Sequence, residues 1–347
     1  MPRGGEMWTR DGFRFGGVAA ASLALVLSLS SCGDDESSTA PIVPPTSPTG
    51  WFTQFSNTSF ALLSVRFVTP RTGIAVGVGG TIRRTTDGGN TWFTPVSGTS
   101  DRLNAVAFGD SMTGVIVGLG GSALRTSDGG VTWVKPDSMV RTVLNGATFT
   151  SPTKVTAVGA SARIFQSLDG GNTWALKFSS GTSSRSLVSV SFGDTLQWFL
   201  YGASHGTALG YLGMIVHTDD GGATWQQQFG GTELFLRSVW FSDANTGTAV
   251  GDGGTILRTT DGGLTWEPQR SGVIAALTGV WFADADTGTV VGYAGTILRT
   301  TNGGLTWFQQ SSGTVQNLYD VFFTDTHHGT VVGENGIILR TVNGGEQ

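Results

Sequence analysis

Apolar residues in this chain follow one short pattern that returns seven times. Leu is followed three residues later by Val and two residues after that by Phe, as in Leu236, Val239 and Phe241, and Ala147 takes the place of Val in the third copy. Alternating apolar positions that end at turn residues predict short, half-buried β-strands. The seven strands begin at Leu62, Leu103, Leu144, Leu187, Leu236, Leu277 and Leu318.

Each copy of the apolar pattern opens a unit of four predicted strands. In the clearest copy, residues 236–241 form the first strand, 247–251 the second and 255–260 the third, and the fourth begins near Trp266. Gly and Asp separate these strands, as expected of tight hairpins. Mostly small residues stand three positions before each Phe, which lets neighbouring units pack closely, whereas the last unit has Asp320 there.

A turn phrase, T/S-x-D/N-G-G-x-T-W, lies between the third and fourth strands of the units. Successive copies are 41 residues apart, except for 51 residues between the third and fourth copies. A four-strand repeat of about 40 to 45 residues is typical of propeller blades. We therefore predict an all-β, seven-bladed β-propeller of four-stranded antiparallel blades. The acidic or amide residue of the phrase is Asp87, Asp128, Asp169, Asp220, Asp261, Asn302 or Asn343.

The composition of the turn phrase indicates a structural role. A carboxylate at the start of a tight turn accepts hydrogen bonds from backbone N–H groups, and the two glycines adopt positive φ angles without steric cost. The Trp buries a large ring. Asn302 and Asn343 keep the acceptor oxygen but not the charge, which fits hydrogen bonding better than catalysis.

The two ends of the repeat region complement each other. The last copy of the phrase ends at Gln347, where the next residue would be its Trp, and Trp51 precedes Trp92 by the same 41 residues. We therefore expect the strand around Trp51 to complete the C-terminal blade. Such a strand pairs an open edge and closes the ring.

Residues 1–50 have a different character from the repeat region. Arg3, Arg10 and Arg14 precede an uncharged apolar stretch at 15–31, which is typical of a secretory signal. The stretch ends in Leu-Ser-Ser-Cys, which resembles the bacterial lipobox, so we expect lipidation of Cys32 after removal of residues 1–31. A cleaved signal with an unmodified Cys is the alternative. Residues 32–50 then form a Pro-, Ser- and Thr-rich tether, and Gly33 favours the outer membrane or cell surface.

Composition and charge narrow the classes of function. The chain has 54 Gly, 11 Trp and a single Cys, so we expect a strand-rich body without disulfides. The formal net charge is −5, and no basic face of the kind that nucleic acid requires is apparent. The membrane contact that we expect is the lipid anchor alone.

The turn phrase resembles the Asp-box, also known as the bacterial neuraminidase repeat. This repeat occurs in sialidases, xyloglucanases, sortilin-type receptors and photosystem II stability/assembly factors. The VGxxGxIxRTxDGGxTW cadence over residues 51–347 and the nearly insertion-free blades are most similar to the assembly factors. That resemblance implies a non-catalytic scaffold that binds a newly made membrane protein. The alternative is a glycan-binding or glycoside-hydrolysing propeller.

Five arginines stand three residues before an Asp-box acid or amide, and they have two interpretations. An arginine array can bind acidic groups of a client in a bidentate manner. Alternatively, Asp110, Asp243, Asp284 and Asp325 supply ion-pair partners within the same blades. Gln166 replaces the arginine in the third blade and His217 replaces it in the fourth. The arginines are Arg84, Arg125, Arg258, Arg299 and Arg340.

The ten extra residues of the fourth unit are the second candidate for a site. We place two of them near 182–186 and eight after Gly202, in a hairpin over 203–212 that contains His205 and Tyr211. We expect both segments on one face of the propeller, where a longer loop is suited to recognition. Loop insertions also cost little stability, so the extra residues need not have a function.

Catalytic and cofactor chemistry have little support in the sequence. The Arg-Ile-Pro motif of sialidases is absent, and the four histidines have no metal-ligand spacing. We expect no enzyme activity, no cofactor and no metal, but a monomer that binds an exported or membrane protein. A surface lipoprotein with no particular client is a further alternative.

Overall fold

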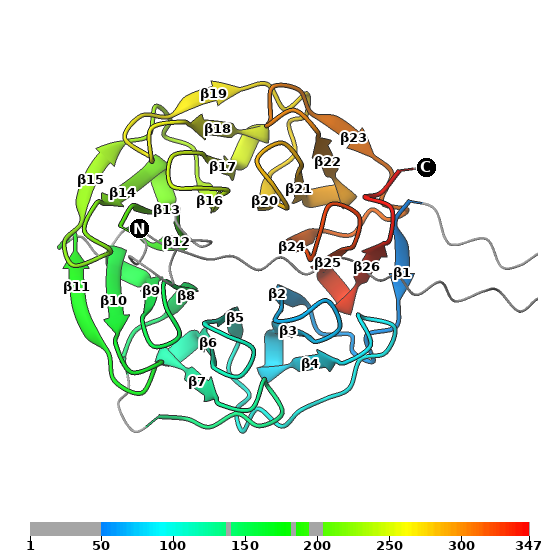
Figure 1. Cartoon of the computed structure of the whole chain (residues 1–347), viewed down its shortest axis with the longest axis horizontal. Coiled ribbons are helices and arrows are strands. Elements are labelled where there is room, and N and C mark those ends of the chain that lie inside the picture. Colours follow the sequence, from blue (N-terminus) through cyan, green and yellow to red (C-terminus); the bar gives the residue numbers. More distant parts are fainter. Residues whose placement is uncertain (1–49, 137–139, 182–184, 194–203, 347) are drawn as a thin grey trace, which may run out of the picture. The chain divides into compact units, whose positions relative to one another are not determined.

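The seven sheets of this protein stand around a central axis like the blades of a propeller (Figure 1). The computed structural model describes residues 50–136, 140–181, 185–193 and 204–346. The predictions for residues 1–49, including the lipidation of Cys32, lie outside the described residues. No helix in the described part of the chain has the length and apolar character that a membrane span requires.

Each blade begins with the predicted apolar strand next to the axis. These inner strands are β2 (Leu62–Phe67), β5 (Leu103–Phe108), β8 (Leu144–Phe149), β12 (Leu187–Phe192), β16 (Leu236–Phe241), β20 (Leu277–Phe282) and β24 (Leu318–Phe323). The second strands are β3 (Gly73–Gly77), β6 (Gly114–Gly118), β9 (Val155–Gly159), β13 (Gly206–Gly210), β17 (Gly247–Gly251), β21 (Gly288–Gly292) and β25 (Gly329–Gly333). Every pairing within a blade is antiparallel, as predicted.

The third and outer strands complete the blades. The third strands are β4 (Ile82–Thr85), β7 (Ala123–Thr126), β10 (Arg163–Ser167), β14 (Met214–Thr218), β18 (Ile256–Thr259), β22 (Ile297–Thr300) and β26 (Ile338–Thr341). The outer strands are β11 (Ala175–Ser179), β15 (Gln226–Phe229), β19 (Glu267–Gln269), β23 (Phe308–Gln310) and β1 (Phe52–Gln54). In blades 1 and 2 the outer strand is reduced to single bridges, Arg84 to Phe93 and Arg125 to Val134.

Each blade core is built from the residues that repeat. In every blade except blade 3, the second strand begins with glycine because a side chain there would meet the inner-strand Phe; a Cβ on Gly73 would lie 2.7 Å from the Phe67 ring. The Asp-box Trp of the same blade, Trp92, packs edge-on against Phe67 with ring centroids 6.1 Å apart. This edge-on arrangement, which is favourable for aromatic rings, recurs in blades 2, 4, 5, 6 and 7.

The Asp-box is a closed hydrogen-bonded turn. In blade 1, Asp87 accepts hydrogen bonds from the backbone N–H of Thr91 (2.9 Å), the Thr91 hydroxyl (2.6 Å) and the Thr85 hydroxyl (2.8 Å). Gly88 and Gly89 have φ angles of 75° and 92°. In blade 6, Asn302 accepts the same backbone bond from Thr306 at 3.0 Å, so the turn needs the acceptor oxygen and not the charge.

The N-terminal strand closes the ring, which confirms the prediction. β1 pairs with β26 in the register Phe52 to Arg340, and the Gly50 N–H donates to the Glu346 carbonyl at 2.7 Å. Trp51 is 8% exposed and packs edge-on against Phe323 of the last blade. The last Asp-box therefore uses Trp51 as its tryptophan.

The two ends of the inner strands define two faces of the propeller. The hairpin between the first two strands and the Asp-box lie together, since the Gly88 N–H donates to the Arg71 carbonyl at 2.8 Å; we name this side the box face. On the other side, which we name the turn face, short 3-10 turns join the second and third strands. These turns are η1 (Val78–Gly80), η2 (Leu119–Gly121), η3 (Ala160–Ala162), η4 (Tyr211–Gly213), η5 (Asp252–Gly254), η6 (Tyr293–Gly295) and η7 (Glu334–Gly336).

Candidate functional site

The arginine array of the third strands links neighbouring blades. Arg84 donates from Nε to the Gly129 carbonyl at 3.0 Å, and Arg125 donates likewise to Gly170 at 3.1 Å. Both acceptors are the first glycine of the next blade's Asp-box. Gln166, which replaces the arginine in blade 3, donates to the equivalent Gly221 carbonyl at 3.1 Å. A neutral side chain thus fills the same position, which indicates that this bond does not need the charge.

No arginine of the array forms the expected ion pair at contact distance within the described residues. The charges of Asp243 and Asp284 nevertheless oppose the burial that lowers the pKa of Arg258 and Arg299. The expected partner Asp110 accepts backbone bonds from Met112 (2.8 Å) and Thr113 (2.6 Å) of its own hairpin instead. Asp243, Asp284 and Asp325 cap their hairpins in the same way. The arginines extend sideways to the next blade. Arg299 donates to the Thr326 carbonyl of the next blade, and Arg340 donates to Asn90 at 3.4 Å. Arg258 and Arg299 donate to a threonine of the adjacent strand in their own blades.

The insertion of blade 4 lies earlier in the chain than predicted. Phe192 pairs directly with Gly206, so residues 206–212 belong to the ordinary blade and the eight extra residues fall within 193–205. Of these, 194–203 are outside the described residues, as are 182–184 of the other predicted segment. For the described residues the expectation of one shared face is also wrong, because Ser186 precedes strand β12 and His205 follows it, at opposite ends of that strand. For the same reason His205 lies at the box face, whereas Tyr211 begins η4 on the turn face.

Two departures from the repeat meet in blade 4. The ring of His217, which occupies the arginine position of the array, lies 6.0 Å from the His205 ring at an angle of 20°. His217 is only 5% exposed, and neither of its nitrogens has a hydrogen-bond partner among the described residues. Burial and the neighbouring His205 lower the pKa of His217, while Asp219 and Asp261 oppose that shift. His205 therefore fills the space that a long arginine would occupy.

A central channel runs between the inner strands and contains a cavity of about 310 Å³. Its walls differ because one inner-strand position, between the repeated Val and Phe, varies among blades. Blades 5, 6 and 7 have Trp240, Trp281 and Phe322 there, with ring centroids 3.7 and 4.1 Å apart along the row. We name these three residues the aromatic wall. Blades 2, 3 and 4 have Ala107, Thr148 and Ser191 at the same position.

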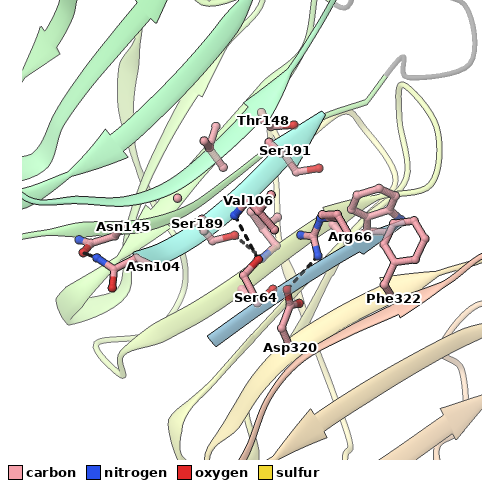
Figure 2. A pocket seen from close by; sticks show the side chains of 18 of the residues that line it. Ser64, Arg66, Asn104, Val106, Asn145, Thr148, Ser189, Ser191, Asp320 and Phe322 are labelled. Carbon is pink, nitrogen blue, oxygen red and sulfur yellow. Dashed lines mark hydrogen bonds and ion pairs between the residues drawn. The ribbon is translucent and has the colours of Figure 1, made fainter. Parts of the chain in front are cut away.

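An ion pair stands at the end of the aromatic wall. Arg66 of blade 1 donates to Asp320 of blade 7 at 2.9 Å, and its guanidinium lies 5.6 Å from the Trp281 ring and 5.9 Å from the Phe322 ring (Figure 2). Asp320 also accepts the Val65 backbone N–H at 3.0 Å. Asp320 thus joins the last blade to the first, and Arg66 presents its remaining N–H groups near the rings.

Most other polar side chains of the channel connect adjacent blades. The Asn104 and Asn145 amides each donate to the backbone of the next inner strand at 2.8 Å, and Ser189 accepts the Val239 N–H at 3.2 Å. By contrast, Thr148 and Ser238 have no side-chain hydrogen bond within the described part of the chain. These two hydroxyl groups remain available to a ligand.

A row of stacked rings borders the channel on the turn face. The Tyr211 ring lies 4.0 Å from Phe235, the Arg237 guanidinium lies 4.4 Å from Phe235 and 5.3 Å from Tyr293, and Tyr293 packs edge-on against Tyr319 at 6.5 Å. We name these five residues the crescent. Arg237 and Tyr319 also line the channel, so the crescent and the cavity are continuous. Tyr211 is 45% exposed.

Sequence reasoning placed Tyr211 in a longer loop and missed the rest of this site. The signal was present, since Trp240, Trp281 and Phe322 are 41 residues apart and share one register. A comparison of the variable positions of the repeat, and not only its constant ones, would have shown the aromatic wall. The described residues contain no group of three or more side chains suited to a metal ion.

Comparisons with known proteins agree with this architecture. A family model described as photosynthesis system II assembly factor YCF48 matches residues 44–137. The structure of YCF48 from Cyanidioschyzon merolae is similar, with a TM-score of 0.69 and 22% identity over 84% of this chain and 98% of that one. A structure described as YCF48 bound to D1 peptide has a TM-score of 0.70 and 22% identity, over 86% and 98% of the two chains.

A glycoside hydrolase is also similar in fold. The GH74 enzyme of Niastella koreensis has a TM-score of 0.68 and 16% identity, over 84% of this chain and 53% of that enzyme. No curated protein matches the chain in sequence. At these identities the similarities establish the seven-bladed Asp-box propeller fold, which resembles both the assembly factors and the hydrolases.

Proposed function

We propose that this protein is a non-catalytic scaffold of the cell envelope that binds a segment of an exported or membrane protein. The observation that carries the proposal is the open channel, in which the aromatic wall and the crescent gather on blades 4–7. Large aromatic side chains beside a cavity are typical anchors of protein interfaces. The similar YCF48 structure with a bound D1 peptide supports peptide binding by a propeller of this kind.

The arginine array gives less support to the proposal than the channel does. Arg84, Arg125 and Arg299 already donate to neighbouring blades, and Arg299 is only 9% exposed. A client carboxylate would have to displace these bonds. We therefore assign client binding to the crescent and the channel, and a structural role to the array.

Glycan binding or hydrolysis is the second candidate function, favoured by the similarity to the GH74 enzyme and by the aromatic wall. Glycoside hydrolysis ordinarily needs two carboxyl groups across the cleft, about 5 to 10 Å apart. Among the described residues that line the channel, Asp320 is the one carboxylate, and it already accepts bonds from Val65 and Arg66. Incubation with a polysaccharide panel tests this function, because released reducing sugar would favour a hydrolase over a scaffold.

Photocrosslinking in the native envelope tests client binding. The photoreactive amino acid p-benzoylphenylalanine replaces Tyr211 of the crescent in the full-length chain. The control carries the same group at Phe229, which is 82% exposed on an outer strand. We expect one discrete envelope protein, identified by mass spectrometry, to be captured from position 211 and not from 229. Equal capture at both positions, or none at 211, would reject the proposal.

We also propose that the scaffold is a monomer held by a lipid on Cys32, at the outer membrane or cell surface. The basic and apolar residues before Cys32 support this proposal. Labelling of cells with a clickable palmitate analogue should mark the wild-type protein but not Cys32→Ser, and membrane fractionation should release the variant. Labelling of both proteins, or of neither, would reject the anchor. Light scattering of the released variant measures its oligomeric state.

A further inference from the structure

The channel cavity lies between two different walls, and this asymmetry indicates what it can hold. Trp240 and Trp281 fill the variable inner-strand position on one side, whereas Ala107, Thr148 and Ser191 leave it open on the other. Large residues at this inner-strand position in all seven blades would fill the channel. The cavity of about 310 Å³ lies at the small end of the range typical of ligand pockets, which suits one ring-sized group.

The charges of the channel favour an uncharged occupant. The charged residues that line it in the described part of the chain are Arg66, Arg237 and Asp320. Arg66 pairs with Asp320, and Arg237 pairs with Asp252 at 2.5 Å. A charged ligand would lose water here without meeting an unpaired opposite charge, which is costly.

The free hydrogen-bonding groups favour an occupant with one polar group. Thr148 and Ser238 have unused hydroxyls, and Ser191 accepts the Phe241 N–H but donates to no described residue. A purely apolar group would cover these hydroxyls without satisfying them. A sugar would present several hydroxyls at once, whereas the amides of Asn104 and Asn145 already donate to the protein backbone.

We propose that the channel binds a tyrosine side chain of an extended client segment, with its ring against the aromatic wall and its hydroxyl near Thr148, Ser191 and Ser238. This inference rests on the proposed client binding. Paired aromatic rings stabilise a contact beyond the area that they bury. Tyrosine supplies both the ring and a single hydroxyl.

Side-chain analogues and short peptides test the proposal on the full chain. The probes are p-cresol, toluene, methyl β-glucoside and two Gly-Ser peptides that carry one Tyr or one Leu, each monitored by ligand-observed NMR. We expect p-cresol to bind with a dissociation constant on the order of 1 mM. Toluene, methyl β-glucoside and the Leu peptide should bind at least about tenfold more weakly than their tyrosine-like counterparts.

A variant that fills the cavity locates the binding. Thr148→Trp places an indole opposite the aromatic wall, and the inner strand accommodates it because Trp240 and Trp281 occupy this register in other blades. Val96→Trp adds the same ring at a position that is 82% exposed. We expect Thr148→Trp to abolish p-cresol and Tyr-peptide binding and Val96→Trp to preserve both. Trp240→Ala, which removes part of the wall, should weaken binding if Thr148→Trp fails to fold.

Several outcomes would overturn the proposal. Equal binding by Thr148→Trp and Val96→Trp would place the tyrosine elsewhere. Preferred binding of methyl β-glucoside would assign the channel to a sugar, and binding of p-cresol without the Tyr peptide would assign it to a free aromatic molecule. If no probe binds while crosslinking at position 211 still captures a client, the tyrosine anchor falls but the scaffold function stands.

Discussion

At the scale of single residues, the Asp-box carboxylates and His217 show how hydrogen bonds and burial together decide the direction of a pKa shift. Desolvation alone raises the pKa of Asp87, but the bonds from Thr91 and Thr85 outweigh it and lower the pKa to about 2. His217 lacks such partners, and burial lowers its pKa. Both shifts make the folded state sensitive to acid, in different pH ranges.

The Asp-box carboxylates should control stability in strong acid. Because their pKa is lower in the folded state than the ordinary value of about 3.9, their contribution is complete above about pH 5 and is lost as the pH falls toward 2. The fivefold Asp→Asn variant at 87, 128, 169, 220 and 261 should lose less thermal stability than the wild type between pH 5 and pH 2.5. Asp219→Asn, at an exposed neighbouring position, is the control. Identical acid losses in the wild type and the fivefold variant would contradict this explanation.

His217 should control stability in mild acid. The unfolded chain protonates at a pKa of about 6.5, above that of His217 in the folded state, so stability declines as the pH falls below about 7. His217→Gln should make the melting temperature less dependent on pH between pH 7 and pH 5, because glutamine does not titrate. The blade should accept glutamine, since Gln166 occupies the same position in blade 3. His327→Gln is the control at an exposed position, and its melting temperature should change with pH as in the wild type. An unchanged slope in His217→Gln would show that other groups dominate.

At the scale of elements, the sequence predicts whatever the repeat determines and little of what crosses between blades. The last blade lacks a fourth strand of its own, which would leave an unpaired edge. Counting 41 residues back from Trp92 gives Trp51, whose strand fills that place. The bond from Arg125 to Gly170 depends on the angle between two blades, which no local pattern contains. The same limit explains why the arginines of the array bond to the next blade and do not contact the acids of their own blades. Tyr211 was predicted in a longer loop because the sequence around Gly202 resembles the start of a second strand. In the structure the second strand starts at Gly206, which pairs with Phe192.

The closing strand should be an important source of stability. Trp51→Ala removes a buried ring and should cost about 3 to 5 kcal/mol in the free energy of unfolding, measured by urea denaturation. Phe55 directly follows β1 and is 81% exposed. Phe55→Ala should therefore change the free energy of unfolding by about 0.5 kcal/mol or less. Similar unfolding midpoints for the two variants would mean that β1 does not hold the ring closed.

At the scale of the whole molecule, a repetitive frame supports a non-repetitive centre. Asp-boxes, glycines and Phe–Trp pairs build nearly equal blades, and the inner-strand polar residues and the Asp320 contact connect them around the axis. The aromatic wall and the crescent differ from this frame and lie on blades 4–7. Binding is therefore assigned to the positions at which the repeat varies.

The most direct test combines the crosslinking probe at position 211 with the filled channel. If a client segment enters the channel from the crescent, Thr148→Trp should lower the yield of the captured envelope protein at least about tenfold, which corresponds to about 1.4 kcal/mol of binding free energy. Val96→Trp should leave the yield unchanged. Equal capture by the two variants, both folded by circular dichroism, would contradict binding in the channel.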